Sequence, residues 1–324
     1  MIRRRALCGA ASLALRRTAR AQGTGSIRLI VPFPPGGASD TAGRIVGQAL
    51  GQALGRSVIV ENRPGAGGII GAEVVARAVP DGSVLGLSNI SPHGIAPLVV
   101  ANPPYDPVDG FTHIALVAET PSVMLVAAAS PLHSIADYVA LARAQAVDRH
   151  GLTYGSAGIG SPQHLQGELL SRIAGVPLTH VPFRGNAPAL QALLGGEVDA
   201  IFSPLAGITG SISAGQVRVI GVTSAERIAA LPTAATFAEQ GFGAITMTSW
   251  TGISGPPGLP PAITQAYNAA INAAISVPDV ARRLEAAGLN PPAHLLDAAG
   301  YHAIIAAFPA TWRPVVKEAN IPAN

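Results

Sequence analysis

Apolar and polar positions follow a repeating order along the chain that predicts strand–turn–helix units. Residues 27–33 form an apolar, β-branched run, which is typical of a buried strand. Residues 34–37 are Pro-Pro-Gly-Gly and predict a tight turn. A helical pattern then begins at Ser39 or Asp40, which we expect to cap the helix, and runs towards Gly55. The free N–H groups of such a helix start favour an anion, although an ordinary βα turn has the same pattern.

Further units follow and predict an α/β fold with a parallel sheet covered on both faces. The first set contains strands over residues 57–61, 84–88 and 112–117 and helices over 69–79 and 92–100. The pattern restarts near residues 119–121. The second set contains strands over 122–129, 152–155, 178–183, 198–202 and 217–222 and helices over 134–146, 162–174 and 188–194, with Ser161 and Asn186 capping the last two helices. A last part adds a strand over 246–254 and helices over 261–275, 278–287 and 301–319.

These sets predict two domains. Domain 1 is expected in two segments, residues 22–120 and 225–324, because the last helices have apolar faces that can pack on the first sheet. Residues 121–224 then form domain 2 with its own sheet. The two crossings near residues 121 and 225 would form a hinge over a cleft. Ligands bind at such interfaces and at the carboxyl ends of parallel strands.

The composition agrees with a globular protein. Of the 324 residues, 48% are hydrophobic and 12% are charged, which can fill a sizeable core and argues against disorder. Six of the 21 Lys and Arg residues lie in the first 22 residues, where no acidic residue occurs. The remaining chain carries 15 basic and 18 acidic residues, a net charge of −3. This balance gives no reason to expect nucleic-acid binding.

The first 21 residues resemble an export signal. They have an arginine-rich start, an apolar middle and a small-x-small site that ends at Ala21, so cleavage is expected before Gln22. The paired Arg16 and Arg17 leave both the general and the twin-arginine export routes open. Cys8 is the only cysteine, so the mature chain would have neither disulfides nor cysteine metal ligands. No later apolar run reaches the roughly 20 residues that span a membrane. We expect a soluble exported protein.

Residues 155–160, Gly-Ser-Ala-Gly-Ile-Gly, form a glycine turn before the helix that Ser161 caps. Ser156 would be a hydrolase nucleophile in a Gly-x-Ser-x-Gly elbow, but Tyr154 occupies the first glycine position. We favour a turn that accommodates a phosphate- or carboxylate-sized anion, because the glycines free the backbone before a helix start. Gly65-x-Gly67 resembles a dinucleotide loop but lacks its third glycine, so no nucleotide cofactor is predicted.

Ionisable side chains give only isolated candidates. The eight histidines show no metal-ligand spacing, so no metal site is predicted. Only His164 lies near a turn that could bind a ligand, and a structural role is its alternative. Arg44 and Arg184 either pair with a carboxylate ligand or form internal ion pairs. Asp40 either stabilises the helix start or accepts hydrogen bonds from a ligand. No pair of carboxylates at catalytic spacing is evident.

Six segments occur in one order: VPFPPGGASDTAGR, VENRPGAGGIIGAEVVARAVPDG, YGSAGIGSPQHL, VPFRGNAPALQALLGGEVDAIF, GVTSAERIAALP and SWTGISGPPGLPP. Together they resemble the Bug/TctC family, the extracytoplasmic solute receptors of tripartite tricarboxylate transporters, over nearly all of residues 26–324. The resemblance implies a type II periplasmic-binding-protein fold, in which two α/β domains close over a ligand. It also implies a monomeric, non-catalytic periplasmic receptor that captures a small carboxylate and delivers it to membrane transporter components.

The resemblance further implies where the ligand binds. One carboxylate would be held by turn backbone and ordered water from both domains, not by an arginine clamp. The first turn would contribute Phe33, Pro35, Gly36, Gly37, Ala38, Ser39 and Asp40. The second turn would contribute Ser156, Ala157, Gly158, Gly160, Ser161 and His164. The end of a strand at Ser203 would form a third wall.

Ser203 departs from the family pattern, because many members carry an aspartate there. An acid at this position would repel a second carboxylate or pair with an amine, and serine does neither strongly. A plain carboxylate is therefore expected rather than an amino acid. Two other functions remain open from the sequence: a sensor that passes closure to a signalling partner, and an enzyme that uses the same cleft.

Overall fold

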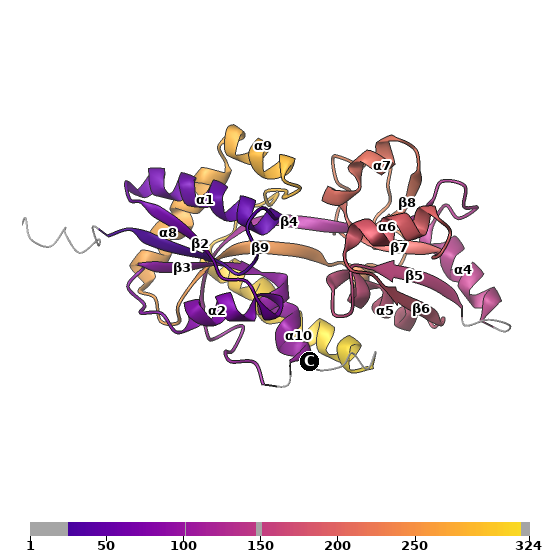
Figure 1. The fold of residues 1–324 in the computed structure, drawn as a ribbon, viewed down its shortest axis with the longest axis horizontal. Helices are drawn as coiled ribbons and strands as arrows, with labels where there is room; N and C mark the ends of the chain where they lie inside the picture. The colour runs from indigo at the N-terminus through magenta and orange to yellow at the C-terminus, as the bar shows by residue number, and fades with distance from the viewer. Residues whose placement is uncertain (1–24, 101, 147–150, 319–324) are drawn as a thin grey trace, which may run out of the picture.

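The computed structural model describes residues 25–100, 102–146 and 151–318, and the predicted leader lies outside this part of the chain. Two α/β lobes lie side by side and are joined by two long neighbouring strands, β4 (Thr112–Ala127) and β9 (Thr248–Gly255) (Figure 1). The strands are connected in the order β2-β1-β3-β9-β4-β7-β5-β6, and β8 also pairs with β4. The α/β class expected from the sequence is confirmed.

The first lobe is built on a mixed sheet. Its central strand β1 (Ile27–Val31) lies between β2 (Val58–Asn62) and β3 (Val84–Asn89) and is parallel to both. Helices α1 (Ala38–Leu54) and α9 (Pro278–Ala286) lie on one face and α2 (Ile69–Ala76) on the other (Figure 1). The lobe also contains a π-helical turn over Ser91–Ile95, α3 (Ala96–Val99) and α8 (Pro261–Ile275). Because helices cover both faces, β1 is buried except at Arg28.

The second lobe repeats this plan. Strand β5 (Leu152–Ser156) lies between β6 (Leu178–Pro182) and β7 (Ala200–Pro204) and is parallel to both. Helices α5 (Pro162–Ala174) and α6 (Asn186–Leu194) lie on opposite faces (Figure 1). The lobe also contains α4 (Ile135–Gln145), α7 (Thr209–Ser213) and β8 (Val217–Val222).

Strand directions bring the two predicted ligand turns to the boundary between the lobes. β4 runs from the first lobe into the second, and β3 has the same direction because both strands are antiparallel to β9. β1 is parallel to β3 and therefore points towards the second lobe. β7 is antiparallel to β4, and β5 is parallel to β7, so β5 points towards the first lobe. The turns after β1 and β5 thus leave their sheets on facing sides.

The two strands predicted over residues 112–117 and 122–129 are one continuous strand, β4. Glu119, Thr120 and Pro121 were expected to break the pattern, but they pair with Trp250, Ser249 and Thr248 of β9. The first part of β4 pairs with β9, and the second part pairs with β7 and β8. The sheet of the second lobe is therefore continuous with that of the first through β4.

Two predicted helix caps are wrong. The N-cap of α1 is Gly37 rather than Ser39 or Asp40, and the N-cap of α6 is Gly185 rather than Asn186. Neither helix has a side-chain cap. A glycine takes the cap position in each case, so the polar side chain that follows lies inside the first turn and is free for other contacts.

Helix α10 (Ala298–Glu318) packs against both lobes instead of the first sheet alone. It contacts β4, α3 of the first lobe and α5 of the second. Its Tyr301 and Trp312 belong to one buried hydrophobic cluster with Ile95 of the first lobe and Leu165 of the second. The core therefore continues from lobe to lobe along this helix, which Figure 1 shows below the junction of the two lobes.

The predicted domain boundaries stay a prediction. Residues after β8 make contacts with the second lobe, since Phe237 stacks on Phe202 with ring centroids 5.9 Å apart. Gln240 also accepts a hydrogen bond from the N–H of Ile135 and donates one to the carbonyl of Ile220.

Among the helices of the described residues, none is long and apolar enough to cross a membrane.

Candidate functional site

The first glycine turn is held in shape by Asp40. Its Oδ2 accepts the N–H of Gly36 at 3.0 Å and the Nε of Arg44 at 3.0 Å. Its Oδ1 accepts the amide of Asn62 at 2.9 Å, and the same amide donates to the carbonyl of Phe33 at 3.0 Å. The guanidinium of Arg44 is the main reason that the pKa of Asp40 is lowered to about 2. Asp40 is thus a charged, buried brace of the turn.

The remaining residues of this turn face solvent. Pro35, Gly36, Gly37 and Ala38 are exposed, and Ser39 is half-buried. α1 begins at Ala38 without a side-chain cap. The exposed start of α1 therefore places the partial positive charge of a helix N-terminus at the surface, where it is available to an anion.

The second glycine turn uses several of its own backbone donors. The buried hydroxyl of Ser156 donates to the carbonyl of Gly158 at 3.1 Å or accepts its N–H at 3.1 Å. The N–H of Ser161 donates to the same carbonyl at 3.2 Å. Ser161 also caps α5, as predicted, because its hydroxyl accepts the N–H of His164. The turn is therefore pre-ordered by internal hydrogen bonds.

His164 lies under this turn. Its Nδ1 accepts the N–H of Gly160 at 3.1 Å, and its Nε2 lies 3.7 Å from Glu168. The side chain is almost fully buried, and this burial lowers its pKa to about 4. His164 is neutral near pH 7 and positions the turn by accepting a hydrogen bond.

A cluster of one buried and two half-buried polar side chains, Tyr154, His180 and Glu168, lies beside His164. His180 stacks on His164 with ring centroids 3.8 Å apart, and its Nε2 lies 2.7 Å from the hydroxyl of Ser156. Burial is the main reason that the pKa of His180 is lowered to about 3, and electrostatic repulsion from the His164 ring when it is protonated is the smaller cause. Tyr154 donates to Glu168 at 2.6 Å, and burial raises the pKa of that carboxyl group. Sequence reasoning missed His180, because only the pairing of β5 with β6 brings it to the turn.

Ser203 is the next-to-last residue of β7, pairs with Val123 of β4 and is buried. Its hydroxyl donates to the carbonyl of Pro204 at 3.3 Å. The neighbouring Ser122 on β4 lies 3.4 Å from the side-chain amide of Gln163, which is part of the first turn of α5. Ser203 is therefore near the start of α5, although its side chain is tied to its own strand.

The two arginine candidates differ. Arg44 forms the internal ion pair that was one of its two predicted roles, and its Nη2 also donates to Asn62 at 3.3 Å. Arg184 is exposed after β6. Within the described part of the chain, no group of three or more His, Cys, Asp or Glu side chains is arranged to hold a metal ion.

A groove of about 540 Å³ opens between the lobes. Ile159 and Gly160 of the second turn form one wall. The first-lobe wall contains Ala66 and Gly67, from the turn after β2, and residues of the π-helical turn and α3. The turn after β2 was missed as a candidate, since its Gly65-x-Gly67 spacing was weighed only as a nucleotide loop. Its backbone has positive φ from Gly65 to Gly68, including 47° at Ala66.

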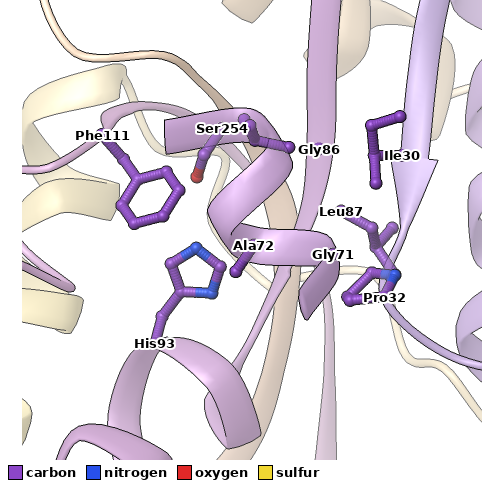
Figure 2. A pocket seen from close by; sticks show the side chains of 10 residues that line it. Ile30, Pro32, Gly71, Ala72, Gly86, Leu87, His93, Phe111 and Ser254 are labelled. Atoms are coloured by element: carbon purple, nitrogen blue, oxygen red, sulfur yellow. The ribbon is translucent and has the colours of Figure 1, made fainter. Parts of the chain in front are cut away.

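A second pocket, of about 400 Å³, lies where the chain crosses between the lobes. Glu119 and Pro121 of β4 line it together with Thr248 of β9. A third feature, around His93, is too small to admit a water molecule. Figure 2 shows the ring of His93 directed towards Phe111, and the ring centroids lie 4.6 Å apart. Burial lowers the pKa of His93 to about 3, so this site is neutral packing rather than a binding cavity.

Two α/β lobes, joined by two strands and separated by a groove, define a periplasmic solute-binding protein. The sequence profile described as "Tripartite tricarboxylate transporter family receptor" matches residues 42–321. The chain belongs to this family of solute-binding receptors, as its resemblance to Bug/TctC proteins predicted. The family is not enzymatic, so the alternative of an enzyme is set aside.

Individual relatives agree with this assignment. A UPF0065 protein encoded in the tcbD-tcbE intergenic region of Pseudomonas sp. (strain P51) is 35% identical over 295 residues, which cover 89% of this chain and 86% of the relative. MatC from Rhodopseudomonas palustris, solved with malate, is 30% identical with a TM-score of 0.70 and covers 90% of this chain and 98% of its own. An R. palustris protein solved with adipate is 30% identical with a TM-score of 0.74 and covers 92% of this chain and 98% of its own.

Proposed function

We propose that this receptor binds a small carboxylate between its lobes, at the glycine turns after β1 and β5. The observation that carries this proposal is that two relatives of 30% identity over nearly their whole length are solved with malate and adipate. Both ligands are small carboxylates. The facing directions of β1 and β5 support the position of the site, because each strand is followed by a helix start.

We propose that the solute's carboxylate is contacted mainly by backbone N–H groups. In the first turn, the N–H of Gly36 is used by Asp40, so Gly37, Ala38 and Ser39 are the proposed donors. In the second turn, the N–H groups of Gly158, Gly160 and Ser161 already donate within the turn. This leaves Ala157 and Ile159 as proposed donors. Phe33, Pro35, Asp40, Ser156, His164 and Ser203 then shape the walls or hold the turns.

Affinity would come from closure of the lobes. A solute that contacts both turns is bound better by the closed form and shifts the open–closed equilibrium towards it. We place the hinge at the crossing strands, where Pro121 pairs with Thr248. This placement keeps residues 225–247 with domain 2 and moves the second predicted boundary from residue 225 to about residue 248.

The proposed receptor is exported and then acts as a monomer. Cleavage before Gln22 would release residues 22–324 into the periplasm, and the closed receptor would deliver its carboxylate to the membrane components of a tripartite transporter. The family assignment supports this role.

A thermal-shift screen of residues 22–324 tests the proposal. Each small carboxylate is compared with its amide, which has the same shape without the charge. A ligand at 100 times its Kd adds about 2.7 kcal/mol to the stability of the native state, which is a readable rise in Tm. Shifts with acids and none with the amides support the proposal. Shifts with neutral or cationic compounds only would show that the glycine turns are not an anion site.

A further inference from the structure

The groove between the lobes has walls without charge. Eleven residues line it and none is ionisable. Its apolar surface comes from Ile69 of α2, Ile95 of the π-helical turn, Val99 of α3, Val100 directly after that helix, and Ile159 of the second turn. A second carboxylate placed against these side chains would be desolvated without a cation, which is costly. A hydrocarbon or aromatic group there gains about 25 cal/mol for each Å² removed from water.

Ile159 connects this apolar wall to the anion turn. It is a large apolar residue at the tip of the turn, and 56% of its surface is exposed. Its own N–H group is one of the two proposed donors of that turn. The start of α5 and the apolar groove are therefore within reach of one solute, which would have its acid group at the turn and its apolar part along α3.

The groove is also large for a short dicarboxylate. Its volume of about 540 Å³ lies within the range of roughly 300–1,000 Å³ that is usual for small-molecule sites. A compact four-carbon acid would leave most of this apolar surface wet.

We propose that the preferred solute is a carboxylate with one acid group and an apolar body, and that the body binds in this groove against Val99 and Ile159. The inference rests on the proposed function, because it takes the acid group to lie at the glycine turns. The inference narrows the proposed function by naming the class of solute. The solute would be an acid with a hydrocarbon chain or a ring, rather than a short hydroxy-dicarboxylate. Closure would bury Ile159 against the solute.

Calorimetric titration of residues 22–324 tests this with matched acids. Hexanoate and adipate have the same carbon chain and differ by one carboxylate, while malate is short and phenylacetate carries a ring. The proposal predicts that hexanoate or phenylacetate binds at least about tenfold more tightly than malate and adipate. Ile159→Ser should weaken that binding about tenfold, because it removes part of a buried apolar contact. Ile173→Ser is the matched control, because Ile173 lies on α5 and is 39% exposed. This variant should leave the affinity for the acids unchanged.

The outcomes separate this inference from the function on which it rests. Tighter binding of malate or adipate than of hexanoate and phenylacetate overturns the apolar substrate class and leaves the carboxylate receptor in place. An equal effect of Ile159→Ser and Ile173→Ser overturns the position of the apolar body. Failure of all four acids to bind, while their amides or amines do bind, contradicts the proposed function itself.

Discussion

His164 and His180 stack face to face under the second glycine turn, with ring centroids 3.8 Å apart and ring planes 14° from parallel. Each ring holds one part of the turn. His164 accepts the N–H of Gly160, and His180 is hydrogen-bonded to Ser156. Burial lowers the pKa of His164 to about 4 and that of His180 to about 3. The shape of the turn therefore depends on two neutral imidazoles.

The two stacked histidines should lower the free energy of unfolding by about 3–4 kcal/mol between pH 7 and pH 5. An unfolded histidine binds its proton near pH 6.5, whereas these two bind theirs near pH 4 or below, so the unfolded state takes up more protons in this window. Glu168 acts in the opposite sense and offsets part of the loss. Its pKa is raised by burial, so its stabilising effect is complete at low pH and is lost as the pH rises through its folded value. Urea unfolding at several pH values measures the slope.

His164→Gln measures how much of this slope comes from the stacked pair, because the buried His93 and His113 add to it in the same sense. Glutamine keeps an acceptor for Gly160 but cannot take a proton in this range, so the variant should show a shallower decline. His133→Gln, at an exposed histidine before α4, is the control and should keep the wild-type slope. A wild-type slope in His164→Gln would contradict the assignment.

Asp40→Ala should lower the free energy of unfolding by about 2–3 kcal/mol, because Gly36, Arg44 and Asn62 lose one shared acceptor. Asp40→Asn keeps an acceptor and should cost less. Asp279→Ala removes the carboxylate of an exposed ion pair with Arg282 and should cost under about 1 kcal/mol. Equal losses for Asp40→Ala and Asp279→Ala, measured by urea unfolding, would refute the bracing role.

A pair of glycine variants tests the packing beneath the second turn. A Cβ at Gly167 would lie 2.0 Å from the ring of Tyr154, which is buried and held by Glu168. Gly167→Ala should therefore destabilise the protein by about 1–3 kcal/mol and weaken solute binding. A Cβ at Gly210 in α7 meets nothing within 4 Å, so Gly210→Ala should be neutral or stabilise by up to about 1 kcal/mol. Calorimetric melting of both variants gives the comparison.

Ser203→Asp should weaken carboxylate binding at least tenfold, since a second negative charge at the end of β7 repels the solute. Ser203→Asn is the control, because it has a similar size without the charge. If Ser203→Asp binds carboxylates as well as the Asn variant does, Ser203 is not part of the site wall. Titration with an acidic amino acid in parallel shows whether the aspartate gains affinity for an amine.

The parts of the fold that depend on local pattern could be predicted from the sequence. The buried run of β1, the Ser161 cap of α5 and the bounds of β8 and α8 all agree with the sequence pattern. Each rests on neighbouring residues or on burial of one segment. The resemblance to solute receptors added the two-lobed arrangement, which periodicity alone left as a hypothesis.

Long-range contacts explain what was missed. The continuity of β4 through Pro121 depends on pairing with Thr248, which is more than a hundred residues away. The role of His180 depends on the register of β5 and β6, which places it beside Tyr154. The cap of α1 was misplaced because Asp40 bonds backwards to Gly36, a contact that the sequence pattern does not distinguish from capping.

The central claim, that the lobes close over a carboxylate, is tested most directly by a distance between them. Residues 22–324 contain no cysteine, so spin labels at Ala53→Cys on α1 and Gln191→Cys on α6, both exposed positions, report one lobe-to-lobe distance. We predict that double electron–electron resonance shows this distance shortening with a saturating carboxylate and staying unchanged with the corresponding amide. Binding of a carboxylate without any change in the distance, or equal shortening with the amide, would contradict the account.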